Sequence, residues 1–485
     1  MIKDRSAWGG MGDAPIRVAE LFAGVGGFRL GLEGVPSSGE KSTFEVVWSN
    51  QWEPSQKVQW ASKIYEERFG SDNHSNEDIH VALKAVPNPD LLVGGFPCQD
   101  YSVARTKSGE LGIEGEKGKL WNPIKKIIRN AEIRPKVVFL ENVPRLLRSP
   151  SKHRGLNFAV ICNDFLSMGY DVEWRVINAS EYGMPQQRRR VFIIAYRRAT
   201  QSNFYRNGKP NFGPTYRSRN SMEKWLLSSE RVKNSKWNAG PFAEAFPTKG
   251  TLPLEKQIFP ELETYDWNSK SSPFHDAGYV WKDNHGGRRW MWTFKPRPIK
   301  EPVMALRDIM VSKHDSEYEI DEKTLVTWRY VKGARKEFRI RKRDRENVGE
   351  KIWNIYQECM SSQSQDFWDL NAHHFEGILG LNSAYRYVEG PIAFPDSLDR
   401  PSRTVVTQEI GKSPDRMRHI IQTNSGVWRR LMPLELERLN MFPDNWTDIE
   451  GIPPSRRGFL MGNALVVGII ERLREPLARI IHSSD

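Results

Sequence analysis

The sequence predicts an α/β fold with a mostly parallel sheet, followed by a second, irregular domain. Up to about residue 198, short β-rich runs alternate with longer helical patterns, as they do where helices connect parallel strands. Between residues 200 and 395 this rhythm stops, and the chain becomes rich in Asn, Ser, Pro, Lys and Trp. We therefore expect three parts, at residues 1–199, 200–455 and 456–485, the last of them a helical segment that returns to the first.

Six apolar or β-branched runs are the strand candidates of the first part. They are Arg17–Phe22, Phe44–Ser49, Asp90–Gly94, Lys136–Leu140, Tyr170–Val176 and Arg190–Tyr196. Near the end of the chain, Gly462–Ile470 is apolar enough to pack back onto these strands. In the middle region no periodic helix is expected before about Val348, and Trp328–Arg345 is interpreted as two strands around a turn at Lys332–Ala334.

The composition indicates a soluble protein with an anionic partner. The 485 residues carry a net charge of +12, which favours nucleic acid as that partner. No stretch approaches the roughly 20 apolar residues of a membrane span. Three cysteines, Cys98, Cys162 and Cys359, are too scattered for a disulfide framework, and no C-x-x-C pair suggests zinc. We expect a metal-free protein in a reducing, cytoplasmic compartment.

A glycine-rich turn follows the first strand. Residues 22–28 lead from a strand through Gly24, Gly26 and Gly27 into a helix, an arrangement that offers a ligand close approach to backbone amides. The dinucleotide fingerprint would need glycine at position 29, where the chain has Arg29. A nucleoside ligand without a pyrophosphate therefore fits better, and the alternative is a turn that only allows tight packing.

Polar side chains follow the next strands. Gln51, Trp52 and Glu53 come after the second strand and could offer ribose contacts and an aromatic face. Asp78 and Ile79 precede a helical stretch, where the carboxylate could meet an adenine amine. Such residues at strand ends more often cap helices or fill edges, so helix capping remains the alternative interpretation.

Cys98 lies on a tight turn, Gly94 to Gln99, directly after an apolar strand. In open α/β sheets ligands bind at this strand edge, and a loop cysteine there can present its thiolate as a nucleophile. A buried, inert cysteine is the alternative.

An acid and several arginines occur at two further strand ends. Glu141 follows the very apolar run Val137–Leu140, so its carboxyl group should be partly desolvated and its pKa raised. Arg188 and Arg190 alternate at the entrance to a strand and should therefore share a face. The alternatives are a helix cap for Glu141 and a solvated surface run for the arginines.

Together these motifs closely resemble the DNA (cytosine-5)-methyltransferases. The specific blocks are F-A-G-V-G-G, G-F-P-C-Q-D-Y-S, E-N-V, P-Q-Q-R-R-R and G-N-A, in the family's order. The resemblance covers roughly residues 16–198 and 400–481 and includes ten motif blocks. It implies an enzyme with a Rossmann-like fold. The enzyme would use S-adenosylmethionine as the methyl donor and release S-adenosylhomocysteine.

The resemblance implies a covalent mechanism on a cytosine flipped out of the duplex. Cys98 adds to carbon 6, Glu141 engages the ring nitrogen and exocyclic amine, and Arg190 contacts the carbonyl oxygen with help from Arg188. The loop from Gln99 to Lys117 resembles the segment that closes over the target base. Within it, Gln99 and Ser102 are expected to contact DNA.

For the methyl donor, the resemblance points to residues at several strand ends. They are Phe22, Gly24, Gly27, Gln51, Trp52, Asp78, Ile79, Pro97, Leu120 and Asn463. The chain departs from the family at Gln51, where an acidic residue usually binds the ribose hydroxyls. An amide accepts hydrogen bonds more weakly than a carboxylate, so either Gln51 suffices or Glu53 contributes.

Target recognition is assigned by exclusion to about residues 200–395. The family-like block Arg400–Thr407 is expected to support this module. Its most suggestive part, Trp328–Arg345, carries nine basic residues against two acids, and Arg339, Arg341 and Arg343 would contact DNA if it forms a ribbon. A solvated hairpin is the alternative.

The expected protein is therefore a prokaryotic modification methyltransferase in the nucleoid-containing cytoplasm. It would act as a monomer on double-stranded DNA, with a cognate restriction endonuclease as a possible companion. Two alternatives remain open: a tRNA cytosine-5 methyltransferase, and a catalytically silent DNA-binding regulator.

Overall fold

The computed structural model separates into two compact units. They comprise Met1–Met304, Glu437–Ile452 and Ala464–Asp485 in the first, and Ala305–Leu436 and Pro453–Asn463 in the second. The structure describes residues 14–36, 42–54, 56–96, 121–198, 205–206, 209–210, 240–249, 257–282, 287–340, 344–379 and 383–482. The first part was expected to end at residue 199, whereas the first continuous segment of the first unit ends at Met304.

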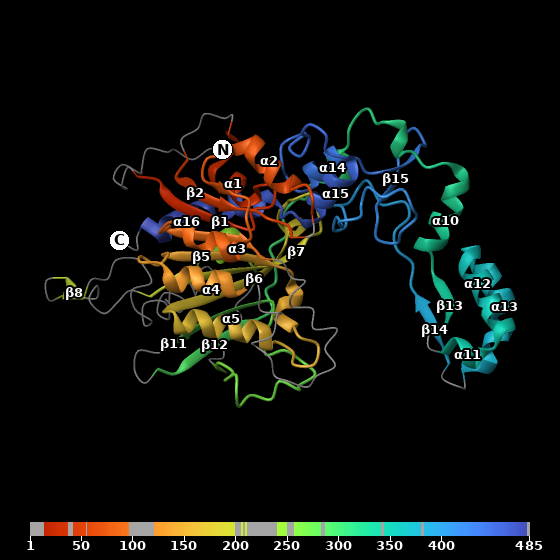
Figure 1. Ribbon diagram of the computed structural model, residues 1–485, viewed down its shortest axis with the longest axis horizontal. Coiled ribbons are helices and arrows are strands. Elements are labelled where there is room, and N and C mark those ends of the chain that lie inside the picture. The colour runs from red at the N-terminus through yellow and green to blue at the C-terminus, as the bar shows by residue number, and fades with distance from the viewer. Residues whose placement is uncertain are drawn as a thin grey trace. The chain divides into compact units, whose positions relative to one another are not determined.

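A ten-stranded mixed sheet forms the centre of the first unit, in the order β10-β12-β11-β6-β7-β5-β4-β1-β2-β3 (Figure 1). One half is parallel: β1 (Ile16–Leu21), β2 (Phe44–Asn50), β3 (His74–Ser75), β4 (Leu91–Gly95) and β5 (Val137–Asn142). The other half is antiparallel: β6 (Tyr170–Asn178), β7 (Arg189–Arg197), β10 (Gln257–Ile258), β11 (Ala277–Lys282) and β12 (Arg289–Phe294).

The α/β class is confirmed, but the sheet is mixed where a mostly parallel one was expected. Only the ten residues 179–188 connect β6 to β7, fewer than a parallel crossover needs, so these two strands pair antiparallel. All six predicted strands are confirmed to within two residues at each end. The sequence prediction missed β11 and β12, because they lie inside the irregular, Trp-rich region.

Helices cover both faces of this sheet (Figure 1). On one side lie α3 (Ile79–Ala82), α4 (Trp121–Asn130) and α5 (Leu156–Ser167), and on the other lie α1 (Gly27–Glu33), α2 (Trp60–Phe69) and α16 (Val467–His482). A Cβ on Gly31 would come within 2.5 Å of Ile470, so α1 and α16 pack closely. The part of the C-terminal segment that forms α16 thus lies in the first unit, packed on α1. Among the described helices, none is long and apolar enough to cross a membrane.

The second unit is more helical than expected. Its elements are α9 (Leu306–Ile309), α10 (Glu322–Lys332), β13 (Arg335–Ile340), α11 (Arg345–Val348), α12 (Glu350–Ser362), α13 (Gln365–Leu379), β14 (Ala384–Glu389), β15 (Ile420–Gln422), β16 (Trp428–Arg430) and α15 (Pro454–Asn463). A further helix, α14 (Pro433–Leu439), spans the boundary between the units. Part of the predicted C-terminal segment, α15, belongs to this unit.

The predicted hairpin at Trp328–Arg345 is wrong, as is the absence of helices before Val348. Asp321 caps α10 by accepting a hydrogen bond of 2.7 Å from the amide of Thr324, and Leu325 and Trp328 are buried one turn apart. The strand that pairs with β13 is β14, more than forty residues later. Local charge and β propensity predicted the strand β13 but not its partner.

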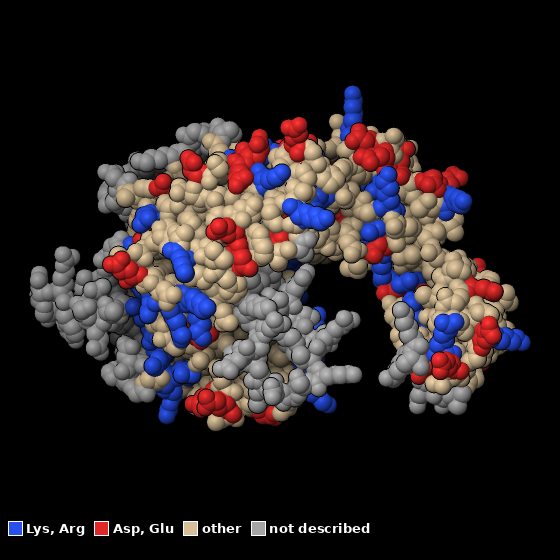
Figure 2. Space-filling model, viewed as in Figure 1, with Lys and Arg blue, Asp and Glu red and all other residues tan. Residues whose placement is uncertain are grey.

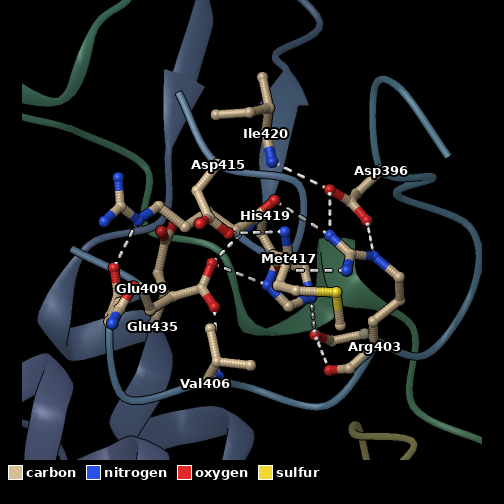
Figure 3. A network of polar contacts seen from close by, with 12 residues as sticks. Asp396, Arg403, Val406, Glu409, Asp415, Met417, His419, Ile420 and Glu435 are labelled. Carbon is tan, nitrogen blue, oxygen red and sulfur yellow. Dashed lines mark hydrogen bonds and ion pairs between the residues drawn. The ribbon is translucent and has the colours of Figure 1, made fainter. Parts of the chain in front are cut away.

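A polar network holds the block Arg400–Thr407 within the second unit (Figure 3). Arg403 forms two hydrogen bonds to the carboxylate of Asp396, at 2.6 and 3.1 Å. The ring of His419 bridges Ser402, at 2.9 Å, and Glu409, at 2.9 Å. This family-like block is therefore fixed by buried side chains of its own unit.

Candidate active site

The predicted catalytic groups meet at one edge of the sheet because of its topology. The parallel strands β4 and β5 end side by side, with Gly95 opposite Glu141. Since β7 runs antiparallel to β5, its beginning lies at that same edge, with Val191 opposite Asn142. A carboxylate at the end of one strand and an arginine at the start of its neighbour are thereby brought together.

Glu141 and Arg190 form an ion pair at this edge. Arg190 Nε lies 2.9 Å from Glu141 Oε1, and the two side chains are 16% and 14% exposed. Burial raises the pKa of Glu141, while the charges of Arg190 and Arg188 oppose the shift. The direction predicted from the apolar strand is confirmed. The carboxyl group therefore keeps a proton at a higher pH than an exposed glutamate does.

Arg188 is buried behind this pair. Its side chain is 1% exposed, and burial together with the charge of Arg190 lowers its pKa well below the usual range. Gln186 accepts a hydrogen bond of 3.4 Å from Arg188 Nη1 and donates one of 3.0 Å to Asn440. Arg188 is thus part of a packed support, and Arg190 is the arginine that reaches Glu141.

Asn142 fixes the exit of β4, a role that the sequence prediction missed. It is buried, and its Nδ2 donates a hydrogen bond of 2.9 Å to the carbonyl oxygen of Phe96. Phe96 is the last described residue before the predicted nucleophile Cys98. In the sequence, the only indication of this role of Asn142 was its position directly after Glu141. Seven predicted site residues lie outside the described part of the chain: Pro97, Cys98, Gln99, Ser102, Leu120, Arg341 and Arg343.

The other two cysteines are described and buried. Burial raises the pKa of Cys162 well above its usual range and that of Cys359 to about 11. Neither thiol has the environment of a thiolate nucleophile.

The glycine turn after β1 leaves open space beside Gly24. Phe22 and Gly24 have φ angles of 53° and 58°, in the left-handed region, and a Cβ on Gly24 would find no atom within 4 Å. Gln51 accepts a hydrogen bond of 2.8 Å from the Gly24 amide. Gly27 differs, because its Cβ would press on Leu465 at 3.1 Å, so this glycine serves helix packing.

The other residues predicted to bind the methyl donor lie in different surroundings. Trp52 is half-buried after β2, and Ile79 is buried. Asp78 caps α3 by accepting a hydrogen bond of 2.8 Å from the amide of His80, and its side chain remains half-buried. Asn463 is exposed at the end of α15, in the second unit.

Arg339 lies on β13, where two groups of its own unit hold its guanidinium group. It forms an ion pair with Glu337 and stacks 4.9 Å from the ring centre of Tyr387. Arg341 and Arg343 lie outside the described residues.

The fold and this edge define a class: an α/β protein with open space at a glycine turn, a desolvated acid and two arginines at the ends of its strands. The family follows from sequence comparison. A model described as C-5 cytosine-specific DNA methylase matches residues 16–479, and the chain belongs to this family. It is a DNA (cytosine-5)-methyltransferase, and enzymes of this family use S-adenosylmethionine.

Individual relatives agree with this assignment. The chain is 37% identical over 472 residues to the Type II methyltransferase M.Sau3AI of Staphylococcus aureus, which covers 96% of both chains. It is 34% identical to the Type II methyltransferase M.HhaI of Haemophilus parahaemolyticus over 43% of this chain and 56% of that one. The Dnmt2 methyltransferase structure from S. pombe covers 96% of this chain and 98% of its own, with a TM-score of 0.50 and 13% identity, which shows the fold alone.

Proposed function

We propose that this chain methylates carbon 5 of a cytosine turned out of duplex DNA, with Cys98 as the nucleophile. The observation that supports this most is the ion pair of Glu141 and Arg190, between the end of β5 and the start of β7. A base held there would have an acid and a fixed positive charge on its polar edge. Cys98 follows two residues after Phe96, whose carbonyl oxygen is held by Asn142.

In the proposed reaction the thiolate of Cys98 forms a bond to carbon 6 of the ring. Glu141, with its raised pKa, donates a proton or hydrogen bond to the ring nitrogen, and Arg190 stabilises the charge on the carbonyl oxygen. S-adenosylmethionine, when bound, supplies the methyl group that carbon 5 accepts. Loss of the carbon 5 proton then breaks the bond between sulfur and carbon 6 and releases Cys98.

The methyl donor would bind at the turn after β1. The open space beside Gly24 and the left-handed backbone at Phe22 fit a nucleoside that approaches main-chain amides. Trp52, Asp78 and Ile79 would complete the site. Gln51 would act mainly by holding Gly24. Pro97, Leu120 and Asn463 are proposed as further contacts on the resemblance alone.

Sequence recognition would belong to the middle of the chain, supported by the network around Arg403. The relative from S. aureus is a Type II methyltransferase that covers nearly the whole chain, and we expect such a protein to work beside an endonuclease. We therefore propose a monomer that acts in the bacterial cytoplasm, with a cognate endonuclease as its functional companion.

The nucleophile can be tested with a duplex that carries 5-fluorocytosine at the target position. Fluorine cannot leave as a proton does, so the enzyme should form a denaturation-resistant adduct when S-adenosylmethionine is present. Cys98→Ala should abolish the adduct. The matched variants Cys162→Ala and Cys359→Ala should retain it. An adduct mapped to Cys162 or Cys359, or one that survives in Cys98→Ala, would overturn the assignment.

A further inference from the structure

A basic pocket lies on the first unit, next to the candidate active site. Its cavity of about 380 Å³ is lined by four arginines, one aspartate, Pro144 and Ser151. The charged residues are Arg145, Arg148, Arg154, Arg189 and Asp276. Four guanidinium groups against one carboxylate give the described part of the lining a net charge of +3, which favours an anionic ligand.

Asp276 orients two of these arginines. Its carboxylate lies 3.1 Å from Arg189 Nη2 and 3.7 Å from Arg148 Nη2. The main-chain oxygen of Asp276 accepts a hydrogen bond of 2.6 Å from the amide of Val176 in β6. The position of Asp276 is therefore set by the sheet. Its carboxylate in turn orients the guanidinium groups of Arg148 and Arg189.

The opposite walls are fastened to each other as well. Ser272 donates a hydrogen bond to the carbonyl oxygen of Leu147. A Cβ on Gly155 would come within 2.6 Å of Ser272 Oγ, so the loop that carries Arg154 packs closely against the segment before β11. The pocket is thus built from three chain segments that contact each other.

Arg145 and Arg154 supply positive charge that the pocket does not neutralise. Both are exposed, and within the described residues no carboxylate lies within ion-pair distance of either. A guanidinium group matches the oxygens of a phosphodiester, and several of them around one cavity suit phosphate better than a carboxylate. The ligand class is therefore a phosphate group.

Two covalent links tie this pocket to the active-site edge. Pro144 follows Glu141 by three residues, so at most about 11 Å of extended chain separates them. Arg189 directly precedes Arg190 in β7, and adjacent strand residues point to opposite sides, one to the pocket and the other to Glu141. A phosphate in the pocket would lie within a few nucleotides of a base held at Glu141.

We propose that this pocket binds a backbone phosphate of the substrate DNA close to the target cytosine. The proposal rests on the proposed function, because it takes a base at Glu141 as its reference point. Arg145 and Arg154 make the contact with the phosphate, while Arg148 and Arg189, held by Asp276, set the shape and charge of the pocket.

The test measures DNA binding of the full chain across a salt series. The double variant Arg145→Gln/Arg154→Gln should lower the slope of log K against log [salt] by up to about 2, one for each lost phosphate contact. A control removes the same charge elsewhere: Lys and Arg side chains also gather where α4 lies (Figures 1 and 2), and Lys126→Gln/Arg129→Gln should leave the slope unchanged.

A second measurement identifies the phosphate. A set of duplexes would each carry one neutral methylphosphonate at a different position near the target cytosine. At a single position the substitution should weaken binding to wild type. At that position wild type and the double variant should then bind with equal affinity. Equal slopes for wild type and the pocket variant, in an enzyme that still forms the Cys98 adduct, would overturn the pocket proposal alone. A wild-type chain that neither binds DNA nor forms the adduct would instead overturn the proposed function.

Discussion

The side-chain oxygen of Gln51 lies 2.8 Å from the amide nitrogen of Gly24 and accepts its hydrogen bond. Gln51 follows β2 and Gly24 lies in the turn after β1, so the bond joins the ends of two neighbouring parallel strands. The amide that replaces the family's usual carboxylate is therefore used to shape the glycine turn. A carboxylate could accept the same bond, but a methyl group could not.

Gln51→Ala should therefore weaken S-adenosylmethionine binding. The loss of one hydrogen bond is worth roughly 1 kcal/mol, or about a fivefold increase in Kd. Gln51→Glu should restore the affinity, and Glu53→Ala should change it little. Isothermal calorimetry on the three variants measures this. The reverse pattern, with Glu53→Ala the weaker binder, would transfer the role to Glu53.

Asn142→Ala should slow formation of the Cys98 adduct, because the carbonyl oxygen of Phe96 loses its donor at the exit of β4. The free energy of unfolding should fall by about 1–3 kcal/mol. Asn142→Asp keeps an acceptor but cannot donate, so it should be slow as well. Chemical denaturation and single-turnover adduct rates separate the two effects. If the adduct rate of both variants equals that of wild type, Asn142 serves stability only.

Glu20 predicts a pH dependence of stability. It is fully buried in β1, accepts a hydrogen bond of 2.9 Å from the Tyr65 hydroxyl, and burial raises its pKa to about 7. Because the folded-state pKa is raised, the protonated form is favoured on folding. The contribution of Glu20 to the free energy of unfolding is fully present below pH 4.5 and is lost as the pH rises towards and through 7, by about 3 kcal/mol in total.

Glu20→Gln should remove this loss, so the variant should gain stability relative to wild type between pH 5 and pH 8. Denaturation midpoints at several pH values measure the difference. Substitution of the exposed Glu67 by Gln is the control and should show no such trend. A constant difference between wild type and Glu20→Gln across this range would mean that Glu20 does not titrate there.

The arginines on β13 and directly after it should contribute unequally to DNA binding. Arg339 is paired with Glu337 and stacked on Tyr387, so Arg339→Gln alone should leave the salt slope of DNA binding nearly unchanged. Arg341→Gln/Arg343→Gln should lower the slope by about 2 if both contact phosphates. S-adenosylmethionine affinity should stay the same in all variants. An unaltered slope in the double variant would exclude these arginines from the DNA-binding surface.

The strands around the candidate site could be predicted because buried parallel strands form continuous apolar runs. Val137–Leu140 is such a run, and it placed Glu141 at a strand end. The pairing of Glu141 with Arg190 needs the antiparallel insertion of β7 next to β5, which no local pattern reveals. The topology, more than the motif, makes these two residues partners.

Contacts between distant segments could not be predicted for the same reason. Asp276 meets Arg148 and Arg189 only because β11 pairs with β6. In the second unit, high charge around β13 suggested a hairpin. The strand instead pairs with β14, which follows two further long helices, α12 and α13, in the sequence. Side-chain type is local information, whereas strand order is decided by burial over the whole chain.

In sequence, the helices α12 and α13 are inserted between the paired strands β13 and β14. The helices and strands share an apolar core, in which Phe338, Trp368 and Phe375 are in ring contact. The stability of this insertion therefore comes from its own side chains. Evolution can lengthen, shorten or exchange such an insertion as long as the two strands still pair. The length and surface of this insertion can in this way change while the ten-stranded sheet of the first unit stays the same.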